Sequence, residues 1–228
     1  MKWFWTSCIL FFGMVLVLPL NAAQLYWGFS GGLNISSIYS DVPNVIDNGI
    51  IRRYPSRQRM AIGGLFGISL GDHLSFQVEP TYLEKGGSLV GEFDLYVKYS
   101  TLEIPLLLKL TFGKKLQPCI FMGPSCAIVL DSEWIFTLGG RQVSADPKNV
   151  FRSFDLGVVA GAGISFPLWK GSVFLNCRYN LGLLNLVKAG TIDLETYSFS
   201  TTIEVYQDDE INSQGFQIML GITFPLGK

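Results

Sequence analysis

The chain has 228 residues, of which only 15% are charged, 14% are aromatic and 25 are glycine, and its mean hydropathy is +0.35. Ordinary soluble domains are about 25% charged, and a chain with this much apolar material is not disordered. Because 17 basic residues meet 18 acidic ones, no basic excess faces a phosphate backbone, which excludes a typical nucleic-acid binder and favours a membrane protein.

Residues 1–23 are predicted to be a secretory signal peptide. Lys2 precedes an apolar run over residues 9–18, and Ala22 and Ala23 form a small-residue cleavage site. The alternative is a membrane anchor, but the run is shorter than the roughly 20 residues of a spanning helix. No later apolar stretch approaches that length, which disfavours a helical membrane protein.

After residue 24, apolar residues recur at every second position, which is the period of a β-strand. The clearest segment is 153–166, where apolar side chains from Phe154 to Phe166 alternate mostly with Ser, Asp and Gly. Pro118 and Pro124 blur the alternation of the fifth segment. The eight predicted strands are 25–35, 58–70, 73–85, 99–112, 116–130, 153–166, 172–182 and 216–224.

The connections between these strands alternate strictly between short and long. The short ones are 71–72, 113–115 and 167–171, and the long ones are 36–57, 86–98, 131–151 and 186–212. Outer-membrane barrels have this pattern, with short periplasmic turns and long extracellular loops. Both termini are then expected in the periplasm.

A soluble β-sandwich or lipocalin-like barrel also alternates, but its second face must be hydrophilic. In segments 25–35, 58–70 and 153–166 that face is mostly Gly, Ser and Ala, which suits a narrow lumen better than a solvent surface. We therefore predict an all-β fold, an eight-stranded antiparallel up-and-down transmembrane β-barrel.

Strand parity places four charged residues inside this barrel, namely Glu79, Glu103, Lys109 and Arg178. Eight strands leave an interior just wide enough for side chains, and unpaired charges there are costly. We therefore expect a lumen polar network that acts as a structural plug. A gated conduit or a proton-linked site is the functional alternative, whereas a wide porin needs some 16 strands.

Closing the barrel pairs its first and last strands, which makes the first and fourth long loops neighbours. The first is basic and the fourth acidic, so a loop–loop contact is predicted, against the alternative of two independently solvated loops. The residues proposed for this contact are Arg52, Arg53, Arg57, Asp208, Asp209 and Glu210.

Little in the sequence indicates catalysis. The single histidine, His73, follows a predicted periplasmic turn, where we interpret it as a turn-flanking polar residue. Three cysteines remain after residue 23, and Cys119 and Cys126 fall on opposite faces of one strand while Cys177 lies two strands away, so we interpret all three as apolar fillers. We expect no enzyme activity, no cofactor and no metal.

Several segments resemble the PorT-like outer-membrane barrels of Bacteroidota. They are 31–36 (GGLNIS), 79–87 (EPTYLEKGG), 99–110 (YSTLEIPLLLKL), 123–125, 155–166 (DLGVVAGAGISF), 178–183 (RYNLGL) and 215–224. The resemblance extends over essentially the whole chain after residue 23. It implies a barrel fold and an outer-membrane location, in a family of many uncharacterised barrels with one member needed for the type IX secretion system.

These observations predict a signal peptide over 1–23 and an outer-membrane β-barrel domain over 24–228, in a Gram-negative bacterium. We expect a monomer that contacts membrane lipid, binds no nucleic acid and serves as a non-enzymatic structural or interaction scaffold with a filled lumen and four long extracellular loops. The alternatives are a component of an envelope assembly with protein partners, such as the type IX secretion system, a narrow channel, and a soluble lipocalin-like binder.

Overall fold

The computed structural model describes residues 23–40, 57–89, 94–138, 141–145, 147, 150, 152–186, 188–196, 199–205 and 211–227. No helix in these ranges is long and apolar enough to cross a membrane. The strands are β1 Ala23–Ser40, β2 Arg57–Leu70, β3 Leu74–Val78, β4 Thr81–Leu89, β5 Asp94–Thr111, β6 Gln117–Leu138, β7 Arg141–Ala145, β8 Phe154–Leu168, β9 Gly171–Gly182, β10 Gly190–Thr196, β11 Phe199–Val205 and β12 Ile211–Leu226.

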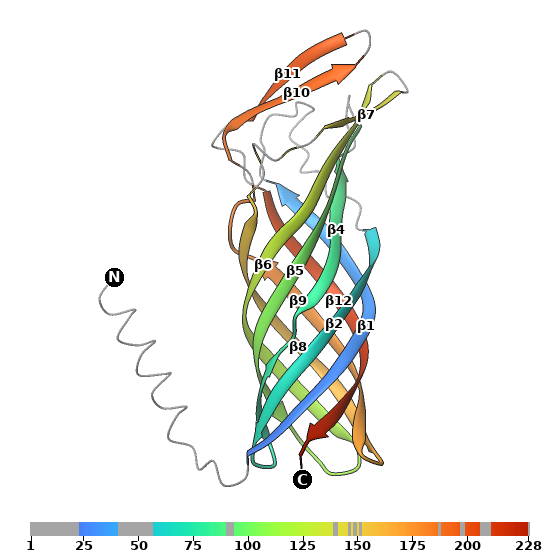
Figure 1. The fold of residues 1–228 in the computed structure, drawn as a ribbon, viewed down its shortest axis with the longest axis vertical. Helices are drawn as coiled ribbons and strands as arrows, with labels where there is room; N and C mark the ends of the chain where they lie inside the picture. Colours follow the sequence, from blue (N-terminus) through green and yellow to red (C-terminus); the bar gives the residue numbers. More distant parts are fainter. Residues whose placement is uncertain are drawn as a thin grey trace, which may run out of the picture.

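The main sheet closes on itself into an antiparallel barrel (Figure 1). Going round the wall, the order is β1, β2, the pair β3/β4, β5, β6, β8, β9 and β12. The barrel closes where β12 pairs with β1, from Leu226 opposite Leu25 to Ile211 opposite Ser40. Because β3 and β4 succeed one another between β2 and β5, the wall has eight positions. The predicted eight-stranded up-and-down barrel is confirmed.

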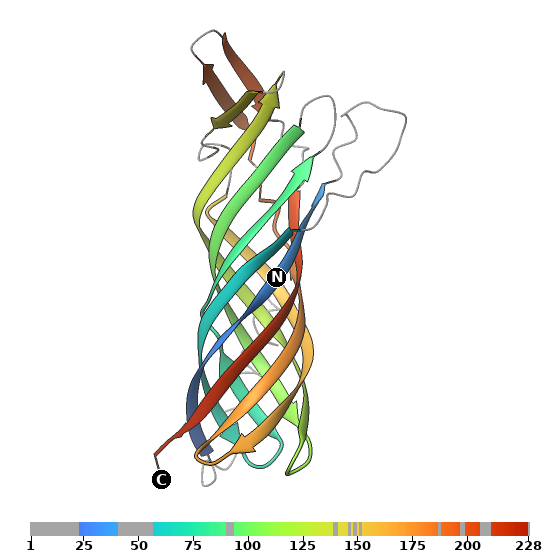
Figure 2. The ribbon, with the colours of Figure 1, turned by 90° about the vertical axis from the view of Figure 1, so that its right-hand side faces the viewer.

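The two ends of the barrel differ. Short turns at residues 71–73, 112–116 and 169–170 lie at one end, together with the start of β1 and the end of β12. Gly71 and Gly113 adopt φ values of 85° and 84° in two of these turns, a conformation that glycine adopts without steric cost. We call this the turn end, and the opposite end, where β7, β10 and β11 lie, the loop end (Figure 2).

The predicted alternation of side chains is confirmed along the wall. Outward residues are well exposed, for example Phe29 at 57%, Met60 at 73% and Leu220 at 59%. Inward residues are buried, with Val159 and Gln217 both at 0%. The apolar side chains therefore form the outer belt, and the barrel has a mixed, largely polar interior, as expected for a wall surrounded by lipid.

The strands at the loop end are longer than predicted. β4 and β5 pair as far as Leu89 opposite Leu95, so the prediction of a long loop over 86–98 is wrong. β6 continues to Leu138 and pairs there with β7, and the predicted fourth loop contains a separate hairpin of β10 and β11. The hairpin keeps the period of two, since Ile192 and Leu194 of β10 share a face with Ile203 of β11 while Thr191 and Asp193 lie on the other.

The predicted strand 73–85 is interrupted at residues 79–80. Pro80 lacks a backbone N–H and therefore cannot continue the ladder, so β3 ends at Val78 and β4 begins at Thr81. The backbone groups remain paired across the break, because Gly64 N donates to Pro80 O at 3.0 Å and Glu79 N donates to Pro105 O at 3.2 Å. The alternation of inward and outward side chains continues across the break, and Glu79 and Thr81 both face inward.

Candidate functional site in the barrel interior

A buried ion pair between Arg178 of β9 and Glu79 crosses the interior. The Arg178 Nη1 donates to Glu79 Oε2, and its Nε donates to Gln217 Oε1 of β12 at 2.6 Å. Gln77 donates to the other Glu79 oxygen and accepts from the Tyr26 hydroxyl at 3.1 Å. Side chains from β1, β3, β9 and β12 thus form one layer, which we call the lower cluster.

A second layer lies nearer the loop end, and we call it the upper cluster. Lys85 Nζ of β4 lies 3.1 Å from Glu103 Oε2 of β5, and Asn180 of β9 donates to Glu103 Oε1. Beside them the Ser213 hydroxyl of β12 donates to Asp155 Oδ2 of β8 at 2.9 Å. A cavity of about 10 Å³ among these residues has room for about one water molecule.

The structure separates the four residues predicted to form a lumen network. Glu79 pairs with Arg178, whereas Glu103 pairs with Lys85 and Asn180. Lys109 joins neither cluster: its Nζ lies 5.9 Å from the centre of the Phe174 ring and the residue lines a cavity at the turn end. The four residues therefore make separate direct contacts, because alternation along a strand gives the face of each residue and not its height along the barrel. That they act as one network stays a prediction.

Two charged members of the upper cluster, Lys85 and Asp155, are not among the residues predicted from the sequence. Lys85 has the same parity as Glu79 and Thr81, and Asp155 falls on the polar face of its strand, so both are inward by the rule that found the others. Lys85 was overlooked because it stands at the end of its predicted strand. With these residues each cluster holds a paired cation and anion, and Asp155 adds a further buried carboxyl.

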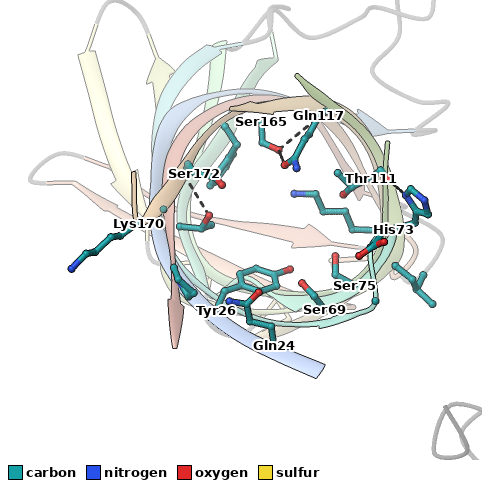
Figure 3. Close-up of a pocket in the computed structure, with 18 of the residues that line it drawn as sticks. Gln24, Tyr26, Ser69, His73, Ser75, Thr111, Gln117, Ser165, Lys170 and Ser172 are labelled. Atoms are coloured by element: carbon teal, nitrogen blue, oxygen red, sulfur yellow. Dashed lines mark hydrogen bonds between the residues drawn. The ribbon is translucent and has the colours of Figure 1, made fainter. Parts of the chain in front are cut away.

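The turn end contains the larger cavity, of about 410 Å³ (Figure 3). Hydroxyl and amide side chains from the wall line it, including Ser69, Ser75 and Thr111. Ser165 donates to Gln117 Oε1 at 3.2 Å across one side. We call this space the turn-end cavity. Its further polar lining residues are Gln24, Tyr26, Asp72, His73, Lys109, Lys170, Ser172 and Thr223.

His73 and the cysteines do not form a reactive site with one another. His73 is exposed at the rim of the turn end, where a ring nitrogen lies 3.0 Å from Thr111 O and the ring stacks on Phe112. Cys119 is buried in the interior, Cys126 is half-buried and Cys177 is exposed on the outer face, and all three are free. Within the residues described, no three His, Cys, Asp or Glu side chains cluster as metal ligands, and the expected lack of a metal or cofactor stays a prediction.

The predicted contact between the first and fourth loops lies outside the described residues and stays a prediction. Positions 52, 53 and 208–210 are not described, and of Arg57 only the backbone in β2 is described. The nearby Arg59 faces a different partner, since its Nη1 lies 3.5 Å from Glu84 Oε2 and its Nη2 donates to the Tyr96 hydroxyl at 2.8 Å.

The family model described as "Outer membrane protein beta-barrel domain" matches residues 21–188. The chain belongs to this family. No curated protein matches it. The family and the closed barrel together make the protein a small outer-membrane β-barrel located in the outer membrane, and the soluble lipocalin-like alternative is wrong.

Solved structures of small outer-membrane barrels are similar to this family member. A major outer membrane protein from Thermus thermophilus aligns over 90% of this chain and 100% of that chain, with 12% identity and a TM-score of 0.51. Neisserial surface protein A aligns over 90% of this chain and 99% of that chain, with 13% identity and a TM-score of 0.44. Outer membrane protein W from E. coli aligns over 90% of this chain and 100% of that chain, with 11% identity and a TM-score of 0.40. At these identities the Thermus protein supports the fold alone.

Proposed function

We propose that the protein is a non-conducting, non-enzymatic scaffold of the outer membrane, with its loop end at the cell surface and both termini in the periplasm. The observation that supports this proposal is the pair of buried ion-pair clusters that cross the interior. Glu79, Arg178, Lys85 and Glu103 are all at most 6% exposed. A solute that passed through the barrel would have to separate these buried ion pairs, which is costly in a dry interior.

Bulky neutral side chains close the space between the charged ones. Leu65, Leu83, Leu107 and Met219 point inward and are no more than 2% exposed. An interior bounded by eight strands is filled by side chains of this size. The barrel thus serves to hold the β6–β7 and β10–β11 hairpins at the loop end, and we expect it to contact membrane lipid as a monomer.

Conductance in planar bilayers tests this role. The wild-type barrel is expected to show no current steps. A variant in which Glu79, Arg178, Lys85 and Glu103 are all alanine is expected to produce small ones, because both buried ion pairs are removed. Ser144→Ala, on the exposed strand β7, is the control and should remain silent. Steady conductance by the wild-type protein would contradict the scaffold and favour the narrow channel.

The finer assignments rest on the sequence. We propose that the chain is one of the PorT-like barrels of Bacteroidota, from the resemblance of its segments, and that residues 1–23 are removed as a signal peptide. A role in an envelope assembly such as the type IX secretion system remains the alternative to an independent scaffold. Pull-down of the full chain with mass spectrometry of the captured envelope proteins distinguishes the two.

A further inference from the structure

Among the described residues, Lys109 is an inward cation without a carboxylate partner. Each cation of the two clusters pairs with a carboxylate, Arg178 with Glu79 and Lys85 with Glu103. The ion pairs in the described part of the chain do not include Lys109. It projects into the turn-end cavity, where its Nζ lies over the face of Phe174.

The cavity around Lys109 suits a hydrophilic ligand. Its volume of about 410 Å³ falls within the range of about 300–1,000 Å³ that small-molecule sites occupy. Its walls offer mostly neutral hydroxyl and amide groups, beside a few apolar side chains such as Phe174 and Trp169 and one carboxylate, Asp72. Strands β2, β3, β5, β8, β9 and β12 each contribute one hydroxyl, from Ser69, Ser75, Thr111, Ser165, Ser172 and Thr223 respectively (Figure 3).

Charge at the rim also favours an anion. Lys114 and Lys115 lie in the β5–β6 turn and Lys170 in the β8–β9 turn, whereas Asp72 is the only carboxylate among the described turn residues. The excess of positive charge at this mouth attracts small anions and raises their local concentration. Lys170 points away from the cavity (Figure 3), which leaves Lys109 as the cation that reaches inside.

We propose that the turn-end cavity binds a small, hydroxyl-rich anion, with Lys109 holding its carboxylate or phosphate and the serine and threonine hydroxyls holding its body. The ligand enters from solution through the turn end and does not pass the lower cluster. The proposal is independent of the scaffold role, because a closed interior and a binding mouth coexist in one barrel.

Competitive acetylation of lysines in the full barrel, in a neutral detergent, tests the site. Glucuronate and glycerol 3-phosphate are the probes, glucose is the uncharged control, and acetic anhydride labelling is read by mass spectrometry. A probe at twice its Kd should slow the labelling of Lys109 about threefold, while the exposed Lys98 and Lys114 are unaffected. Equal protection by glucose, equal protection of Lys114, or no protection by either probe overturns the proposal.

Titration calorimetry with the same probes gives a second readout. Lys109→Gln should weaken binding about tenfold or more, since a charge-assisted hydrogen bond is lost, and the matched Lys114→Gln should leave the Kd unchanged. Both variants must keep the heat-modifiable band shift of the folded barrel. A parallel sample in phosphatidylglycerol vesicles distinguishes the source of the anion: if only the lipid protects Lys109, the soluble-ligand proposal is wrong.

Discussion

Arg178 is the residue on which the lower cluster depends. It is 3% exposed and bonds both the Glu79 carboxylate and the Gln217 amide, while Glu79 also accepts from Gln77. A buried pair of this kind recovers its desolvation cost only when both charges and their hydrogen bonds are present. Removing one partner therefore leaves an unpaired buried charge, whereas removing both leaves the lower cluster without charge.

The first prediction is a double-mutant cycle on this pair. Arg178→Met or Glu79→Gln alone should lower the free energy of unfolding by about 3–5 kcal/mol, measured by urea titration with a heat-modifiability gel. The double variant should lose clearly less than the sum of the two. The matched control couples Arg178→Met with Glu103→Gln, whose partner is Lys85; that pair should be closer to additive. Equal coupling in both cycles would contradict the two-cluster arrangement.

At the scale of the strand, the outer face is defined by alternation and by its aromatic ends. Trp27 packs against Phe224 with ring centres 5.5 Å apart near the turn end, where Phe166 and Trp169 are also exposed. Tyr179 is exposed higher on β9 and donates to Gln214 at 2.7 Å. These side chains fit the aromatic girdles at the two interfaces of an outer-membrane barrel, with the aliphatic belt between them.

The second prediction follows from that belt. Val158→Arg in β8 and Leu106→Arg in β5 place a charge on the outward face, where the native side chains are 38% and 54% exposed. Each substitution should lower the free energy of unfolding by about 2–4 kcal/mol if the charge lies at the bilayer midplane. Ser165→Thr, on the inward face of β8, should cost much less. The heat-modifiability gel in lipid measures all three, and equal tolerance would count against the assigned faces.

The same strands show which features the sequence could predict. Inside the membrane, one face meets lipid and the other meets the interior, so an apolar residue at every second position is required and Phe154–Phe166 was assigned correctly. Beyond the membrane both faces of a hairpin meet water, and the five-residue β7 is too short to show such a period. β10 keeps it, because Ile192 and Leu194 alternate with Thr191, Asp193 and Glu195. The partner of an inward charge was equally unpredictable, because it depends on the height that each strand's tilt and stagger gives the residue.

For the whole molecule, the orientation proposed above rests on the difference between its two ends. The turn end has three tight turns and both ends of the described chain, and the loop end has the β6–β7 and β10–β11 hairpins. Outer-membrane barrels direct short turns to the periplasm and long connections outward. In the proposed orientation the anion site faces the periplasm, where soluble ligands reach it without crossing the barrel.

The last prediction tests this orientation in whole cells. On a background in which Cys119, Cys126 and Cys177 are alanine, Lys114→Cys marks the turn end and Ser144→Cys marks the loop end, and both positions are exposed. A maleimide that cannot cross the outer membrane should label Ser144→Cys in intact cells. It should label Lys114→Cys only after the outer membrane is permeabilised, since the turn end then becomes accessible. Labelling of Lys114→Cys alone in intact cells would invert the barrel and move the turn-end cavity to the cell surface.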